Sequence, residues 1–163
     1  MVRLRAAAAM ILLLVVSPAA AQNKEASTPA DILTGVYREA VKGKPDAWLE
    51  PGRRGKYVSK SLAALWAKVD AKPPPDGEEG AYDINITTDT NSEDLGSFEI
   101  KPQNQSATAA VVAVKIIYRK PYRGPAPVVT YHFVNENGQW RVDDIRGKEW
   151  DLRDMLSLWL KAS

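Results

Sequence analysis

Two segments of the chain carry apolar residues at the spacing of one helix face. Thr28 or Asp31 is placed to cap the start of the first segment, and Gly43 is placed near its end. Ser59 is placed to cap the second, and the prolines at 73–75 prevent its continuation. The apolar positions that predict these two helices are Ile32, Leu33, Val36, Tyr37, Ala40 and Val41, then Leu62, Leu65, Trp66 and Val69.

From Ser97 onward the apolar period changes to two, which is typical of strands. Pro102 should end a short edge strand, because proline cannot donate to the ladder. Asn137-Gly138 lies between two alternating runs and predicts a tight hairpin turn. The strands expected from these signals are 97–102, 107–119, 128–135 and 139–145. A short amphipathic C-terminal helix is expected over Leu152, Met155, Leu156, Trp159 and Leu160.

The connections between these elements differ in composition. Residues 43–58 are punctuated by Pro and Gly and are predicted to form a loop. Residues 72–95 form a long acidic connection, of a length that is uncommon in a compact domain and is often functional. Within it, 89–94 begins like a calcium loop but lacks the required Gly and closing Glu. A solvated acidic loop is the better interpretation.

The order of the elements predicts an α+β fold. N-terminal helices should pack on a curved antiparallel sheet of three to four strands, followed by a short C-terminal helix. A length of 163 residues fits one domain, and 45% hydrophobic with 26% charged residues is ordinary globular composition. The absence of Cys excludes disulfides and thiolate chemistry, and a single His excludes a multi-His metal site. We therefore expect no cofactor and no metal.

The first 21 residues have the pattern of an export signal. Arg3 and Arg5 precede an uninterrupted apolar run of 11 residues at 6–16, and a small-residue cleavage pattern ends at Ala21. The run is shorter than the roughly 20 apolar residues that span a bilayer, which disfavours the alternative of an uncleaved anchor. We expect cleavage after Ala21 and a periplasmic or extracellular protein with no stable membrane insertion.

Signal removal changes the charge and defines the domain boundaries. It removes two Arg and no acid, so 20 basic and 20 acidic residues remain. A neutral chain gives no support for nucleic-acid binding, which favours a basic face. We divide the chain into a signal peptide at 1–21, a flexible leader at 22–30 and a single α+β domain at 31–163.

Three motifs indicate a more specific fold. They are Tyr57-Val58-Ser59-Lys60-Ser61-Leu62, Tyr82-Asp83-Ile84-Asn85-Ile86, and Gly138-Gln139-Trp140-Arg141-Val142-Asp143-Asp144-Ile145 followed by Leu152-Arg153. With these motifs, residues 30–160 resemble the bacterial exported family called domain of unknown function 3828. That family is similar in fold to nuclear transport factor 2, a cone-shaped, cystatin-like α+β roll. The resemblance implies this roll and an exported setting, but no reaction and no catalytic residues.

The turn at Asn137-Gly138 sets the register of the last hairpin, because a two-residue turn makes Glu136 face Gln139. Side chains alternate, so the following pairs divide between the two faces of the sheet. The face expected to be concave carries Asn135–Trp140, Phe133–Val142 and Tyr131–Asp144, and the other face carries Val134–Arg141 and His132–Asp143.

Tyr131 and Asp144 are the weak catalytic candidates in this register. Burial would raise the pKa of Asp144, and a phenol could hydrogen-bond a developing charge, as in some roll-fold isomerases. The structural alternative, which we favour, is a solvated rim carboxylate beside a satisfied hydroxyl, and a bulge would reverse the face. His132 with Asp143 could form a general-base dyad, but a surface ion pair is the better interpretation.

Charged and aromatic clusters leave two further alternatives open. One alternative is that basic residues form a surface for an acidic protein or for anionic lipid headgroups. The other, which we favour, is that they compensate the acidic loop and protect strand edges from aggregation. These residues are Arg53, Arg54, Lys56, Lys60, Lys115, Arg119, Lys120 and Arg123. Trp48 and Trp150 either anchor an interface or fold back over the core.

We expect a non-catalytic binding domain for an unknown protein partner or a small apolar ligand. The predicted ligand cavity is lined by Tyr37, Trp66, Tyr131, Phe133 and Trp140. The main alternative is an isomerase- or hydrolase-like enzyme that uses Tyr131 and Asp144. A third possibility is a protein-facing role, such as an envelope accessory or immunity factor, through the charged segments 76–94 and 115–123.

Overall fold

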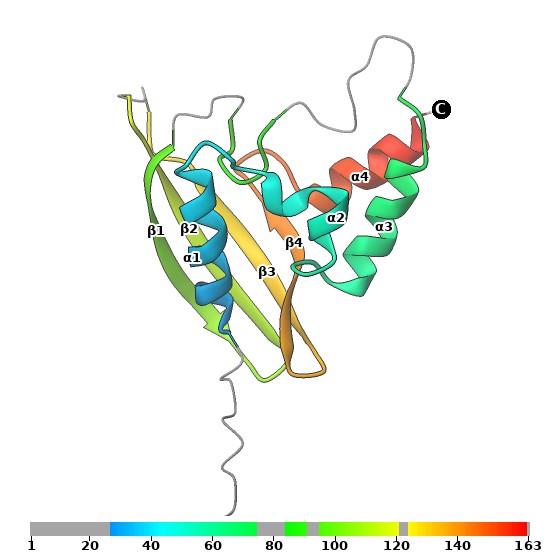
Figure 1. Cartoon of the computed structure of the whole chain (residues 1–163), viewed down its shortest axis with the longest axis horizontal. Coiled ribbons are helices and arrows are strands. Elements are labelled where there is room, and N and C mark those ends of the chain that lie inside the picture. Colours follow the sequence, from blue (N-terminus) through cyan, green and yellow to red (C-terminus); the bar gives the residue numbers. More distant parts are fainter. Residues whose placement is uncertain (1–26, 75–83, 91–94, 121–123, 163) are drawn as a thin grey trace, which may run out of the picture.

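A four-stranded antiparallel sheet carries the helices of this α+β fold (Figure 1). The computed structural model describes residues 27–74, 84–90, 95–120 and 124–162. The elements are α1 (Pro29–Ala40), the 3₁₀ turn η1 (Ala47–Leu49), α2 (Pro51–Arg54), α3 (Lys60–Asp70), β1 (Leu95–Gln105), β2 (Ala109–Tyr118), β3 (Val128–Glu136), β4 (Gln139–Arg146) and α4 (Leu152–Lys161). The strand order is β1-β2-β3-β4, so the α+β class predicted from the sequence is confirmed.

The two predicted helix caps are confirmed. Thr28 accepts a hydrogen bond from the backbone of Asp31 at 3.2 Å, and the Asp31 carboxylate accepts one from the backbone of Thr28 at 3.0 Å, which is a capping box. Ser59 Oγ accepts from the Leu62 backbone at 3.0 Å. Helix α1 thus begins at Pro29, inside the segment expected to be a leader.

Two local predictions are wrong. Residues 43–58 are not a plain loop, because η1 and α2 lie within them and bury Trp48 and Arg54. Pro102 does not end the first strand, which continues to Gln105 after a register shift that follows Pro102. The physical reason is that β1 is an edge strand, where the missing N–H of proline removes no ladder bond.

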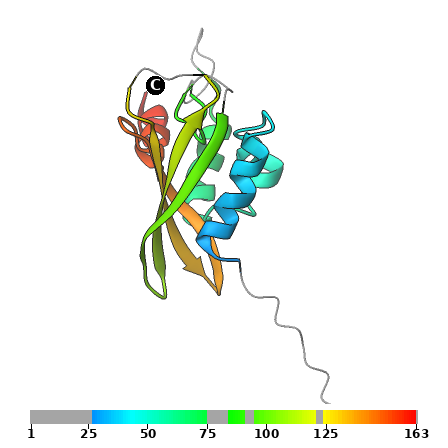
Figure 2. The same cartoon turned by 90° about the vertical axis from the view of Figure 1, so that its left-hand side faces the viewer.

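Helices cover the sheet in two places. Helix α1 lies across one face above β1 and β2, while α3 and α4 pack side by side near β4 (Figures 1 and 2). The core between the layers includes both aromatic and aliphatic side chains. Its largest fully buried members are Trp48, Trp66, Tyr37, Tyr131, Phe133, Leu33, Leu62, Ile86, Leu95, Ile116, Ile145 and Leu152.

Candidate functional site

The β3–β4 hairpin follows the predicted register only as far as Phe133. Asn137 and Gly138 have φ angles of 54° and 81°, as a type I′ turn requires, and Phe133 faces Val142. A register shift follows between Phe133 and His132. Beyond it, His132 faces Asp144 rather than Asp143, and Tyr131 faces Ile145 rather than Asp144. Both predicted pairs are therefore wrong, because β4 has one extra residue.

Contacts with two helices hold the extra residue, Asp143, in place. Its carboxylate accepts hydrogen bonds from Ser59 Oγ at 2.5 Å and from the Arg153 guanidinium at 2.6 Å. The guanidinium also donates to the Asp143 carbonyl at 2.6 Å. No other residue in the described part of the chain hydrogen-bonds this carboxylate, so the proposed His132–Asp143 dyad is not formed. Ser59 is fully buried and serves as the α3 cap, a role that leaves it no access to a substrate.

The carboxylate of Asp144 belongs to the junction between β4 and α4. It accepts from Arg146 Nε at 3.1 Å, from the Ile145 backbone at 2.9 Å and from the Arg153 backbone at 3.3 Å. Burial raises the pKa of Asp144, whereas the bond from Arg146 opposes that rise and the nearby Asp151 adds to it. Asp144 thus anchors the start of α4, and the structure does not bring it to Tyr131.

Tyr131 instead forms a buried polar cluster with Tyr37. The two hydroxyl oxygens lie 3.0 Å apart, and the Tyr37 hydroxyl donates to the Thr87 carbonyl at 2.7 Å. The Tyr131 hydroxyl is consequently the donor to Tyr37. Burial raises the pKa of both phenols, and their proximity raises that of Tyr37 further. Both groups therefore remain neutral and serve to fix the backbone at Thr87.

The short segment 84–90 is held in the core by residues from η1 and its preceding turn. The Asp46 carboxylate accepts from the backbone N–H groups of Ile86 and Thr87 at 2.9 and 3.0 Å. Trp48 Nε1 donates to Thr87 Oγ1 at 2.8 Å. Ile86, Thr87 and Thr88 are fully buried, so this part of the acidic connection packs into the core. Residues 75–83 of the connection and positions 91–94 of the predicted solvated loop lie outside the described residues.

Sequence reasoning missed Asp46 and Thr87, whose hydrogen bonds hold segment 84–90 in place, and it missed the burial of Thr88. Asp46 follows a proline in a loop-like stretch, and the two threonines lie in a polar run, so none has a periodic signal. The alternation of Ile84 and Ile86 with polar residues was the available sign that this segment is partly buried.

The buried carboxylate of Asp46 predicts a measurable pH dependence. Burial raises its pKa above the ordinary 3.8, although the bonds from Thr87 and Ile86 oppose the rise. The folded state then binds more protons than the unfolded state as pH rises past the ordinary value, so the contribution of Asp46 to stability falls with rising pH. The unfolding free energy of wild type minus that of Asp46→Asn should therefore decrease as the pH is raised above about 4. Urea denaturation at several pH values measures it, and a difference that is constant or increases with pH would contradict the assignment.

The five residues predicted to line a cavity do not share one environment. Tyr37, Trp66, Tyr131 and Phe133 are at most 2% exposed. Tyr37 and Tyr131 contact each other edge to face, whereas the Trp66 ring lies 4.3 Å from the Arg54 guanidinium carbon. Trp140 is half-buried and lines a surface groove. The four buried residues are thus core packing, and Trp140 lies apart from them.

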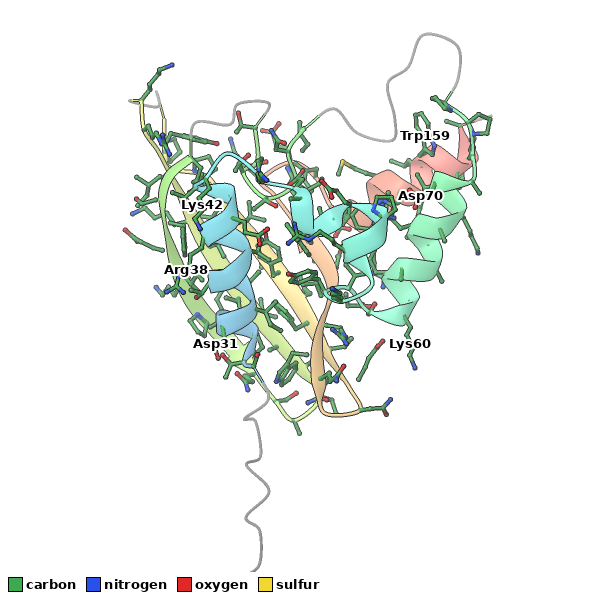
Figure 3. The ribbon with its side chains drawn as sticks, viewed as in Figure 1. Asp31, Arg38, Lys42, Lys60, Asp70 and Trp159 are labelled. Atoms are coloured by element: carbon green, nitrogen blue, oxygen red, sulfur yellow. The ribbon has the colours of Figure 1, made fainter. Side chains whose placement is uncertain are left out.

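This groove, which we call the hairpin groove, lies between the N-terminal half of α1 and the tip of the β3–β4 hairpin. It has a volume of about 670 Å³. Its apolar walls are the side chains of Ile32, Tyr57 and Trp140. A smaller hollow of about 350 Å³ lies on the α3 side of the same hairpin. Asp31 of α1 and Lys60 of α3 mark the two sides (Figure 3).

Some charged side chains near the β3–β4 hairpin have hydrogen-bond partners, whereas others have none among the described residues. Asp31 is engaged with Thr28, and the Arg141 guanidinium donates to the Lys56 carbonyl and the Gln139 amide oxygen. No described residue pairs with the ammonium groups of Lys56 or Lys60. The rim of the hairpin groove therefore presents the Lys56 ammonium next to the half-buried rings of Tyr57 and Trp140, while Lys60 lies beside the smaller hollow.

The other predicted basic clusters are largely compensated. Arg53 pairs with Glu39 at 2.8 Å, Arg54 with Asp70 at 2.7 Å, and Lys115 with Glu99 at 3.3 Å. Arg119 donates to the carbonyls of Leu95 and Val41 at 3.2 and 2.8 Å. Arg123 lies outside the described residues. Trp48 is buried and Trp150 donates to Asp89, so both fold back onto the domain.

The described residues offer no place for a metal centre, since nowhere among them do three His, Asp or Glu side chains gather. Within the same ranges, none of the helices is long and apolar enough to cross a bilayer. No protein-family model matches the sequence, and no curated protein matches it significantly. The site must therefore be interpreted from its own geometry.

Proposed function

We propose that this chain is a non-catalytic binding domain of an exported protein, and that it holds a protein partner in the hairpin groove. The observation that carries the proposal is the contrast between the interior and this groove. The hydroxyls of Tyr37 and Tyr131 and the carboxylate of Asp143 are occupied by structural bonds. Trp140 and Tyr57, in contrast, stay half-buried beside the Lys56 ammonium, which has no partner among the described residues. Aromatic anchors that are partly covered and rimmed by charge are typical of protein interfaces.

Two features of the sequence support export of the protein and a roll-like version of the α+β fold. The pattern of residues 1–21 supports export, with cleavage after Ala21. The resemblance to the exported family and the α+β element order support a cone-shaped roll like that of nuclear transport factor 2. A binding role is compatible with export and with this fold. Because side chains fill the interior of the roll, a partner would bind at a groove on its outer surface.

The test is native mass spectrometry of the mature domain, purified gently from its own compartment. We expect a bound protein that is lost in Trp140→Ala, with affinity reduced at least about tenfold. Leu158→Ala is the matched control, because Leu158 is 63% exposed on α4, away from the groove. A bound small molecule that survives Trp140→Ala would overturn the groove as the site. The absence of any bound species would overturn stable binding.

A further inference from the structure

Strand β1 is an outer strand of the sheet, and no described residue pairs with its outer edge. The other outer strand, β4, is covered at Val142, which exchanges hydrogen bonds with the Tyr57 carbonyl and the Ser59 N–H at 2.8 Å each. In Figure 2, β1 lies nearest the viewer and no described element lies in front of its edge. An uncovered edge strand is a template for pairing with another strand.

The ladder shows which β1 groups face outward. Ile116 donates its N–H to the Pro127 carbonyl at 2.9 Å, so its backbone groups point toward β3. Its partner on β1 is Phe98, whose N–H and C=O must therefore point away from β2. The register is unbroken from Ser97 to Pro102, so Ile100 faces outward in the same way, and Pro102 presents an outward carbonyl. None of these outward groups has a partner among the described residues.

The side chains between these positions carry opposite charges. Glu99 and Lys101 project from the face opposite α1, and both are exposed. Glu99 lies 3.3 Å from Lys115 Nζ, whereas Lys101 has no ionic partner among the described residues. Strand β1 thus carries a carboxylate at Glu99 and an ammonium without an ionic partner among the described residues at Lys101. The outward-facing backbone of Ile100 lies between them.

We propose that β1 is a self-association interface, at which two copies of this chain pair edge to edge and antiparallel about a twofold axis at Ile100. In this register Ile100 exchanges two backbone hydrogen bonds with its symmetry mate. Phe98 N–H donates to the Pro102 carbonyl of the second copy, twice by symmetry. Glu99 of each copy faces Lys101 of the other, so the dimer is a continuous eight-stranded sheet with two ion pairs across its centre.

Charge selects this register over its neighbours. Centring the axis on Glu99 would place two glutamates opposite each other, and centring it on Lys101 would oppose two lysines. Like charges directly opposite are destabilising in a sheet. Because Pro102 has no N–H, the pairing is limited to the short stretch around Ile100. The dimer interface is therefore small, and the fraction of dimer should depend on protein concentration.

Sedimentation velocity of the mature chain, at concentrations up to roughly 1 mM, tests the proposal. We expect a reversible dimer. Glu99→Lys and Lys101→Glu should each raise its dissociation constant about tenfold or more, because both cross-strand pairs become repulsive. The double exchange E99K/K101E should restore dimerisation. A mixture of the two single variants should form a heterodimer, since every pair between them is again attractive.

Two controls separate this interface from general effects of charge. Lys115→Gln removes the intramolecular partner of Glu99 without touching the edge, so it should leave the dimer intact. Ile100→Pro removes a central outward N–H and should abolish dimerisation, while circular dichroism reports that the fold is retained. A wild-type chain that stays monomeric at every concentration, or single variants that dimerise as wild type does, would overturn the proposal.

Discussion

Trp48→Ala should lower the free energy of unfolding by about 3–5 kcal/mol. The Trp48 ring is 2% exposed and packs against Tyr57 and Tyr131 at centroid distances of 5.6 and 6.3 Å. Truncation removes this packing, leaves a cavity, and deprives Thr87 Oγ1 of its indole donor. The result would show that a turn outside the main helices is a principal part of the core.

Urea denaturation followed by circular dichroism measures this change. Trp48→Phe is the matched control, because it keeps an aromatic ring in the core but removes the indole N–H. Loss of that hydrogen bond should lower the free energy of unfolding by about 1 kcal/mol. A loss below about 1 kcal/mol for Trp48→Ala would contradict the assignment of η1 and segment 84–90 to the core.

Tyr37→Phe should be more destabilising than Tyr131→Phe. The Tyr37 hydroxyl donates to the Thr87 carbonyl and accepts from Tyr131, so its removal breaks two buried hydrogen bonds and should cost about 1–3 kcal/mol. The Tyr131 hydroxyl donates to Tyr37, and its removal leaves one lone pair without a donor. That change should cost about 0.5–1.5 kcal/mol.

The double variant Tyr37→Phe/Tyr131→Phe completes a mutant cycle. The two hydroxyls share one hydrogen bond, so the combined loss should be smaller than the sum of the single losses. Urea denaturation midpoints at constant slope provide the values. Equal effects of the two single variants, or strict additivity, would show that the hydroxyl of Tyr37 does not connect Thr87 to Tyr131.

Local sequence signals predicted the elements that depend on neighbouring residues. Thr28 and Ser59 cap their helices because a side-chain oxygen can reach N–H groups a few positions ahead. Asn137-Gly138 adopts positive φ angles that few other pairs tolerate, so the turn and the first four facing pairs of the hairpin are confirmed. Periodicity also placed Tyr37, Trp66, Tyr131 and Phe133 inside.

The candidate site was less predictable, because one residue inserted in β4 reassigns every later side chain. Asp143 is accommodated there by Ser59 and Arg153, which are distant from it in sequence or lie on another element. No periodic pattern records such contacts. The predicted Tyr131–Asp144 pair was wrong for this reason, and Asp144 belongs to the base of α4 instead.

The sequence by itself determined the α+β class, the helix caps, the tight turn and the apolar faces, because these follow from backbone geometry and local hydrogen bonding. Only the tertiary structure decided which polar groups meet. Tyr37 from α1 converges on Thr87 with Asp46 and Trp48 from η1 and its N-cap, and the bulge moves Asp144 away from Tyr131. The physical reason is that buried polar groups must find partners, and those partners are fixed by the packing of distant segments rather than by spacing along the chain.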